Sequence, residues 1–209
     1  MTRIVDMKEL KRALFSCLKE VSELVNDIYR SRDKFPWHYM DKDTDLFEAV
    51  VRVADHLKID VSQAVPAKMA LNEKKYPVKL CMDNMQKYTA YSEHTKIGKD
   101  LGQTIVVDWN DNKIELKAEC NDMEALYRLC SSWSKATLEF SALRGFDKYE
   151  NQMNVLFAMN GELSELNDIF LWMDTESNGE VITDEKWDKA AQEIADVILY
   201  YLKFWNCHV

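Results

Sequence analysis

The sequence has no apolar run that could cross a membrane. Its longest uninterrupted apolar stretch, Val197–Leu202, is six residues, whereas a spanning helix needs about 20. The first ten residues mix charged and apolar side chains, which is the pattern of neither a secretion signal nor a transit peptide. These absences predict a soluble, cytoplasmic protein without a membrane partner, with entry into the nucleus left open.

Positive charge is in short supply. The chain carries 27 Lys and Arg against 36 Asp and Glu, a formal net charge of −9 at pH 7. Binding to nucleic acid depends on cationic contacts with phosphates, so we expect no nucleic-acid partner. A phosphorylated small molecule stays compatible with this charge if a metal ion and a few local cations neutralise it.

Paired cysteine spacings are missing as well. The five cysteines are an odd number, and no two of them form a Cys-x-x-Cys pair. Disulfide frameworks and zinc sites usually show such regular pairs, whereas several of these cysteines fall on apolar helical stripes. We therefore predict buried thiols in a reducing compartment. They are Cys17, Cys81, Cys120, Cys130 and Cys207.

The sequence does contain two pairs of acids, each inside an apolar helical pattern. Glu162 and Glu165 lie one helical turn apart in the first segment, and Glu193 and Asp196 lie one turn apart in the second. The segments are Asn154–Trp172, with the stripe Leu156, Met159, Leu163, Leu166 and Phe170, and Lys189–Trp205, with the stripe Ile194, Val197, Ile198, Tyr201, Leu202 and Trp205.

If these two helices pack antiparallel, the four acids face one another. Two like charges about 4 Å apart repel by roughly 4 kcal/mol at an effective dielectric of 20, so the cluster needs protons, cationic side chains or a metal ion. Ligands that are all oxygen suit Mg²⁺, or Mn²⁺, better than zinc. A di-iron carboxylate bundle would need Glu-x-x-His pairs, which the sequence lacks. Either pair alone would indicate a solvated helix face.

These motifs resemble the metal-binding signature of the MazG-like all-α nucleoside triphosphate pyrophosphatases. The surrounding sequence is most similar to the dCTP pyrophosphatase branch. It starts with Arg-Gly-Phe-Asp-Lys-Tyr at 144–149, leads into Asn154 and ends with Leu171 and Trp172. The resemblance implies that Glu162, Glu165, Glu193 and Asp196 are catalytic and hold Mg²⁺, that water attacks the α-phosphorus, and that pyrophosphate leaves.

A second element of the same branch lies earlier in the chain. Residues 68–77 read Lys-Met-x-x-Asn-x-x-Lys-Tyr-Pro, at the end of a predicted helix Ser62–Lys75 that Ser62 or Asp60 would cap. In the family this element helps to hold the phosphates. The resemblance therefore implies phosphate contacts from Lys68, Asn72, Lys75 and Tyr76; without it, the lysines would be ordinary surface cations.

The base pocket implied by the resemblance consists of Phe146, Asn154, Trp172 and Tyr200. Ordinary core packing is the alternative for Phe146 and Tyr200. Two departures weaken the assignment to dCTP, because Phe146 stands where the branch usually has Trp and Glu150 stands where it usually has His.

The amino-terminal part of the chain partly repeats the carboxyl-terminal part. An offset of 142 aligns a predicted helix Lys8–Arg30 with the first acidic segment, and an offset of 141 aligns a predicted helix Leu46–Ile59 with the second. Arg52 stands where the second copy has Glu193, which predicts a degenerate site held by salt bridges: Glu20, Glu23, Arg52 and Asp55. The identical positions at offset 142 are Leu14, Phe15, Glu20, Ser22, Glu23 and Leu24 against Leu156, Phe157, Glu162, Ser164, Glu165 and Leu166.

The segments between the copies are less regular. Ser31–Asp45 reads as a loop, Val78–Leu101 as mostly irregular, and Thr104–Glu119 as a β-hairpin around Asn110–Asn112. Asn121–Arg144 reads as a helix with a capping signal from Asn121 and Glu124 and an end at Gly145.

We therefore predict an all-α, MazG-like helical bundle of two tandem units with a small β-hairpin insertion. Residues 1–80 form the degenerate unit with the lysine helix, 81–120 a linker, and 121–209 the unit with the complete metal motif. Because the first copy has the phosphate lysines and the second has the acids, we expect them to assemble one composite site.

The predicted function is Mg²⁺-dependent hydrolysis of dCTP, or a modified dCTP, to dCMP and pyrophosphate, which would clear unwanted nucleotides from the pool. Two alternatives remain: a dUTP or broad-specificity pyrophosphatase, and a non-catalytic helical interaction protein. Because the family works as dimers of helical units arranged in tetramers, a homodimer of this tandem chain is expected.

Overall fold

The computed structural model describes residues 3–31, 44–82, 122–175 and 179–207, and these ranges form an all-α fold, as predicted. They contain seven helices and one two-stranded sheet. The elements are β1 (Arg3–Val5), α1 (Met7–Ser31), α2 (Thr44–Leu57), α3 (Val61–Lys75), α4 (Val78–Cys81), α5 (Met123–Arg144), α6 (Gln152–Phe170), β2 (Glu180–Ile182) and α7 (Asp184–Asn206). The predicted β-hairpin at 104–119 lies outside the described residues.

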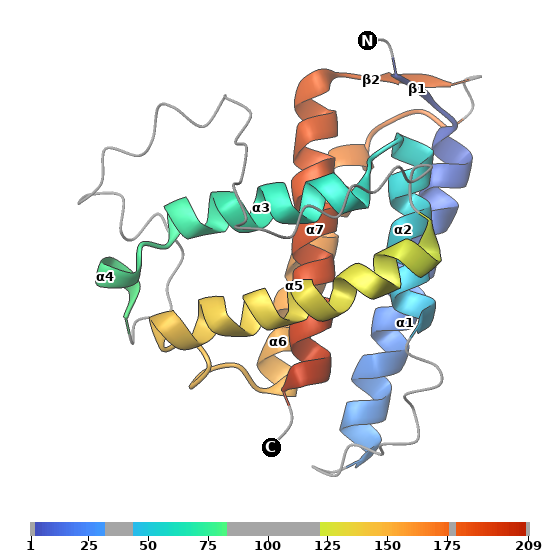
Figure 1. Ribbon diagram of the computed structural model, residues 1–209. Helices are drawn as coiled ribbons and strands as arrows, with labels where there is room; N and C mark the ends of the chain where they lie inside the picture. Colours follow the sequence, from blue (N-terminus) through green and yellow to red (C-terminus); the bar gives the residue numbers. More distant parts are fainter. Residues whose placement is uncertain (1–2, 32–43, 83–121, 176–178, 208–209) are drawn as a thin grey trace.

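Two antiparallel helical hairpins form the centre of the molecule (Figure 1). Helix α1 packs on α2, α6 packs on α7, and the hairpins join through contacts of α1 with α6 and of α2 with α7. Leu163, Phe170 and Ile194 are fully buried in the shared core. Each such side chain stabilises the fold by about 1.5–3 kcal/mol through burial, so the apolar stripes read from the sequence fix the seam between α6 and α7.

Helices α3 and α5 cross the central bundle on one side of α7 (Figure 1). The Asp60 side chain starts α3, because its Oδ1 accepts hydrogen bonds from the amide of Ser62 at 2.9 Å and from its hydroxyl at 2.7 Å. Tyr76, before Pro77, ends it. Both helices contact α7, and they also contact each other, so they enclose the face of α7 on which the acids lie.

Helix α5 ends at Arg144, as the sequence predicts, but begins at Met123, two residues later than the predicted range. Gly145 has a φ of 66°, the left-handed conformation that commonly stops a helix at glycine. The amino-terminal cap is Asp122, whose side chain accepts hydrogen bonds from the amides of Glu124 and Ala125. The predicted cap, Asn121, lies outside the described residues.

A short antiparallel sheet ties the start of the described chain to the connection between α6 and α7. Ile4 of β1 pairs with Val181 of β2. Arg3 forms an ion pair with Asp184 and lies 4.2 Å above the Trp187 ring. The sequence pattern did not predict either strand, because three-residue strands are too short to show a period.

Residues that the offset of 142 aligns occupy similar places in α1 and α6. Leu14 and Leu156 are both buried, whereas Phe15 and Phe157 are 67% and 70% exposed. The two hairpins thus share a pattern of burial as well as of sequence. The division into a degenerate and a complete unit stays an interpretation.

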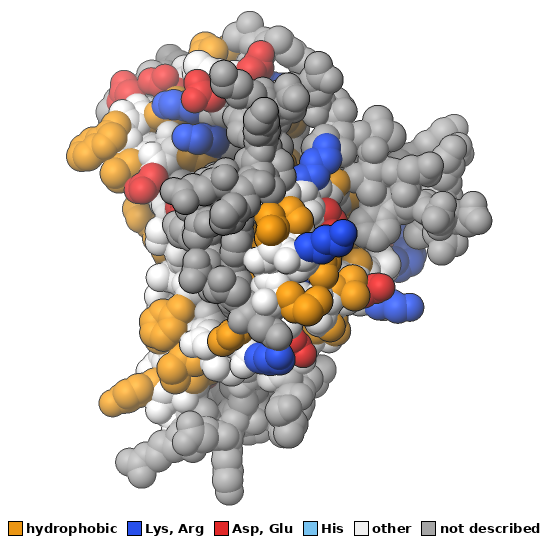
Figure 2. Space-filling model, turned by 90° about the vertical axis from the view of Figure 1, so that its left-hand side faces the viewer, with side chains coloured by type: hydrophobic (Ala, Val, Ile, Leu, Met, Phe, Trp, Pro, Cys, Tyr) orange, Lys and Arg blue, Asp and Glu red, His pale blue; other side chains and the backbone are white. Residues whose placement is uncertain are grey.

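The described surface mixes several kinds of side chain. Figure 2 shows hydrophobic side chains in small groups between Lys, Arg and acidic side chains on one face. No helix in the described ranges has the length and apolar character needed to cross a bilayer. The four cysteines in these ranges are free thiols, with Cys17 and Cys81 buried.

Candidate metal and nucleotide site

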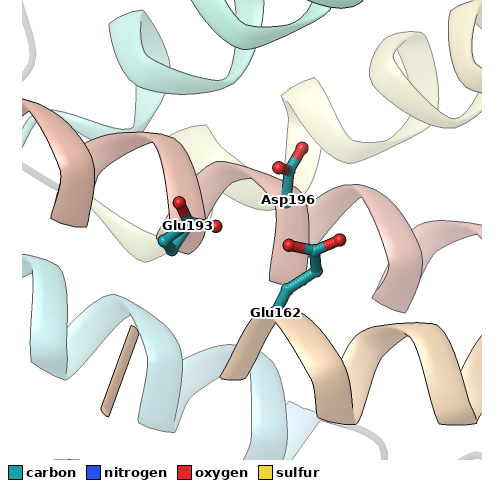
Figure 3. A group of neighbouring side chains, drawn as sticks. All are labelled: Glu162, Glu193 and Asp196. Carbon is teal, nitrogen blue, oxygen red and sulfur yellow. The ribbon is translucent and has the colours of Figure 1, made fainter. Parts of the chain in front are cut away.

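Three acidic side chains converge between α6 and α7. Glu162, Glu193 and Asp196 each place a carboxylate oxygen within 4.8 Å of the others. Figure 3 shows Glu162 reaching from α6 toward the two acids of α7. Their spacing of one turn on each helix, together with the buried stripes beside them, explains the convergence. Glu165, one turn after Glu162, is exposed and lies outside this close group.

The three acids are close enough to oppose one another's ionisation. Partial burial, followed by the charges of Asp196, Glu193 and Glu165, raises the pKa of Glu162 from 4.5 to about 8. Burial also raises the pKa of Glu193, against the opposing effect of Lys68. The cluster therefore retains a proton near neutral pH unless a further cation neutralises it.

Helix α3 supplies lysines to the same place. Lys68 is 5% exposed, and its Nζ lies 2.6 Å from Oδ2 of Asp196. Lys75 stands two turns further along α3; burial and the charge of Lys68 lower its pKa, whereas Asp196, Glu193 and Glu162 act in the other direction. Acids from the second half of the chain and lysines from the first half thus share one electrostatic environment.

A cavity of about 600 Å³ opens beside this cluster. That volume is within the range of small-molecule sites. Helices α3, α5, α6 and α7 all contribute to its wall, as do Tyr76 and Phe146 in the connections. The lining residues are Lys68, Met69, Asn72, Glu73, Lys75, Tyr76, Ala136, Thr137, Phe140, Phe146, Ala158, Gly161, Glu162, Glu165, Gln192, Glu193, Asp196, Leu199, Tyr200 and Lys203.

Aromatic rings form a separate part of the cavity wall. Tyr76 meets Phe146 edge to face at 6.1 Å and Phe140 at 6.3 Å. Burial, with added effects of Glu162, Asp196, Tyr76 and Glu150, raises the pKa of Tyr200, which therefore stays neutral. The cavity combines a charged cluster with an aromatic wall, which suits a ligand that is both anionic and aromatic.

The structure brings most of the sequence-predicted site residues together and leaves two elsewhere. All four acids, the four residues of the lysine element, Phe146 and Tyr200 line the cavity. Asn154 and Trp172 do not line it. The side-chain amide of Asn154 donates a hydrogen bond to the Tyr149 carbonyl at 2.9 Å, and Trp172 is 91% exposed. The base pocket as predicted is therefore only half assembled within this chain.

Several side chains that support the cavity were not singled out from the sequence. Arg144 is buried, and its guanidinium donates to the carbonyl of Tyr76 at 2.6 Å and to Glu73 at 2.5 Å, which joins the end of α3 to the end of α5. Lys203 is buried beside Glu150, with which it forms an ion pair. The sequence signal for a buried lysine was the position of Lys203 inside the apolar stripe of α7.

The acids of the first copy have different partners. Nζ of Lys19 lies 2.9 Å from Glu20 and 3.0 Å from Glu23, and Arg52 lies 3.8 Å from Glu48. A lysine thus stands between two of the acids of the predicted degenerate site. Arg52 pairs with Glu48, one turn earlier on the same helix, and Glu48 was not among the residues of the predicted degenerate site.

Comparisons with known proteins give one local similarity. No family model matches the chain, and no solved structure matches it. The chain is 32% identical over 73 residues to dCTP pyrophosphatase 1 of Mus musculus, a match that covers 34% of this chain and 43% of the mouse protein. The chain thus spans less than half of that relative. This partial match supports a distant relation to the MazG-like superfamily and no narrower assignment.

Proposed function

We propose that this protein is a divalent-metal-dependent nucleoside triphosphate pyrophosphohydrolase that converts dCTP, or a modified dCTP, to the monophosphate and pyrophosphate. The observation that carries the proposal is that three converging carboxylates, two lysines and an aromatic wall line one and the same cavity. The local similarity to a dCTP pyrophosphatase supports the same activity.

The acidic cluster has the chemistry of a magnesium site. Its ligands are all carboxylate oxygens, as Mg²⁺ prefers, and the raised pKa of Glu162 indicates a local excess of negative charge. Glu162, Glu193 and Asp196 would hold the ion, which when bound neutralises charge on the triphosphate. Mn²⁺ fits the same ligands.

The other side chains of the cavity would bind the phosphates and accept a proton. Lys68 and Lys75 would pair with phosphate oxygens, and Asn72 and Tyr76 would donate hydrogen bonds to them. Glu165, exposed and outside the close group, would accept the proton of the attacking water. That water forms a bond to the α-phosphorus while the bond from this phosphorus to the bridging oxygen breaks, and pyrophosphate leaves. Removal of unwanted deoxynucleotides is the physiological role that this reaction would serve.

A release assay for pyrophosphate tests the proposal directly. The purified protein is given Mg²⁺ with dCTP, 5-methyl-dCTP, dUTP, dTTP and the ribonucleotides in turn, and Glu193→Gln serves as the inactive reference. We expect release from a deoxycytidine nucleotide that depends on Mg²⁺ and on Glu193. Equal rates across the panel would indicate a broad-specificity enzyme, and a preference for dUTP would indicate a dUTP pyrophosphatase.

A non-catalytic role is the alternative of another class. It predicts no magnesium-dependent release with any nucleotide and no difference between the wild type and Glu193→Gln. The expected homodimer is also part of the proposal, and light scattering with size-exclusion chromatography measures it.

A further inference from the structure

A buried ion pair stands at the wall of the cavity, two turns along α7 from Asp196. Lys203 and Glu150 form this pair, and their side chains are 10% and 7% exposed. The hydroxyl of Ser141 donates a second hydrogen bond to Oε1 of Glu150 at 2.9 Å. Of the two charged partners, only Lys203 lines the cavity. The pair therefore presents a fixed cation to whatever occupies this part of the cavity.

The position of Lys203 along α7 sets its distance from the candidate metal site. Glu193, Asp196, Tyr200 and Lys203 follow one another at three or four residues, so they share one face of the helix. Seven residues from Asp196 to Lys203 correspond to about 10 Å of rise. Tyr200 lies between them, because the charges of both Asp196 and Glu150 act on its hydroxyl. A ligand anchored by phosphates at Asp196 would thus bring its other end to Lys203.

The chemistry of Lys203 limits which atom it can recognise. A lysine ammonium carries three N–H donors and no acceptor, and Glu150 takes one of these donors. The ring of Tyr200 lies 5.5 Å from the same Nζ, and Thr137 and Phe140 line the wall of the cavity. An oxygen acceptor on the edge of a flat ring would fit against this wall and receive a charge-assisted hydrogen bond.

We propose that Lys203, held in place by Glu150 and Ser141, is a specificity-determining residue that donates a hydrogen bond to the carbonyl oxygen of a pyrimidine base. This inference rests on the proposed function, since it deepens the account of the same cavity. Lys203 is the contact to the ligand, whereas Glu150 and Ser141 are positioning residues. The inference also explains why a charged pair is kept inside an apolar helix seam, where burial of charge is otherwise unfavourable.

Binding measurements on the full chain test this role without relying on turnover. We would measure by calorimetry, in Mg²⁺, the affinity of an α,β-imido analogue of dCTP and of inorganic tripolyphosphate, which has no base. Lys203→Met should weaken binding of the nucleotide about tenfold to a hundredfold, the range for a hydrogen bond to a charged group. Its affinity for tripolyphosphate should stay unchanged.

Two further variants separate recognition from folding. The double variant Lys203→Met with Glu150→Gln removes both charges, so it leaves no unpaired buried carboxylate and should show the same selective loss. Lys189→Met, an exposed lysine of the same helix, should bind both ligands as the wild type does. Thermal melts would identify any variant that fails to fold.

The outcomes distinguish this inference from the proposed function. Equal weakening for both ligands, or no weakening for the nucleotide, would overturn the role of Lys203 even if the wild type hydrolyses dCTP. A selective loss with no hydrolysis by the wild type would keep the base contact and overturn the enzymatic proposal. A wild type that binds neither ligand would overturn both.

Discussion

Nζ of Lys68 lies 2.6 Å from Oδ2 of Asp196, and both side chains are nearly buried. Lys68 comes from α3, before the long segment 83–121, and Asp196 comes from α7, after it. The ion pair therefore joins the two halves of the chain at the candidate site. Because the ammonium stands beside an acid that would also bind a divalent ion, the two cations would compete for the same oxygen.

Replacing Lys68 tests two effects of this side chain: it stabilises the metal-free acids, and it pairs with the phosphates of the substrate. In Lys68→Met the acids lose their buried cation, so the metal-free protein should lose about 3 kcal/mol of stability, as when a buried pair is broken. Mg²⁺ should then raise the melting temperature more than in the wild type, since it no longer competes with the ammonium. Turnover should fall, because the phosphates lose a cationic partner. Melts with and without Mg²⁺, together with kcat, provide the measurement.

Lys74→Met is the matched control on α3, because Lys74 is exposed and does not line the cavity. It should match the wild type in all three measurements. An unchanged magnesium shift in Lys68→Met would show that the lysine and the ion do not share a ligand.

The internal repeat allows each candidate ligand to be compared with its counterpart. Glu162→Gln and Asp196→Asn should lower kcat at least a hundredfold if these groups hold the ion for catalysis. Glu20→Gln and Asp55→Asn, the aligned changes in the first copy, should leave kcat within about twofold and act mainly on the free energy of unfolding, because Glu20 would lose its ion pair with Lys19. Steady-state kinetics and urea denaturation measure both. Comparable catalytic losses in the two copies would rule out a single site.

The raised pKa of Glu162 predicts how stability depends on pH. In the unfolded chain this carboxyl titrates near 4.5, and in the metal-free fold near 8. Between these values the folded state binds more protons than the unfolded state, so the free energy of unfolding should decrease as pH rises through this window. Urea denaturation at several pH values in EDTA measures the slope.

Magnesium should reverse this trend, because the ion binds deprotonated carboxylates. The stabilisation by Mg²⁺ should therefore increase as pH rises through about 8. Glu162→Gln should reduce the pH slope in EDTA, since the shifted group is gone. A slope that is the same in this variant would assign the titration to another residue.

The sequence predicted the helices and the convergence of three of the four acids, because both depend on periodicity. A spacing of three residues on neighbouring helices is enough to place Glu162 near Asp196 once the buried stripes pack. The contact between the lysine helix and the acids depends on tertiary structure, and it was expected only from the family resemblance of the lysine element together with the internal repeat. The short strands β1 and β2 gave no signal, since their pairing joins residues almost 180 positions apart.

Residues outside the periodic pattern were harder to place. Trp172 is the second residue after the end of α6, where no helical stripe fixes its direction, and its side chain is exposed instead of lining the cavity. Lys203 and Arg144 were missed because composition favours a surface position for charged residues. Their burial depends on Glu150 and on the Tyr76 carbonyl, partners that the sequence alone does not bring near.

Two glycines provide a test of the fold through the free energy of unfolding alone, without a measurement of activity. Gly179 has a φ of 117°, and a Cβ there would come within 2.5 Å of Cγ2 of Ile4 in β1. Gly179→Ala should therefore cost about 1–3 kcal/mol through backbone strain and weaken the pairing of β1 with β2. Thermal melts and faster amide exchange at Val5 would report these two effects.

Gly161, inside α6, should respond in the opposite direction. A Cβ at this position meets nothing within 4 Å, and alanine is favoured over glycine in a helix interior by roughly 1 kcal/mol. Gly161→Ala should therefore raise the free energy of unfolding while Gly179→Ala lowers it, although both substitutions add the same methyl group. Equal destabilisation of both variants would contradict this explanation. Of the two glycines, only Gly179 lies against Ile4 of β1, so a clash with that strand could not account for a loss at Gly161.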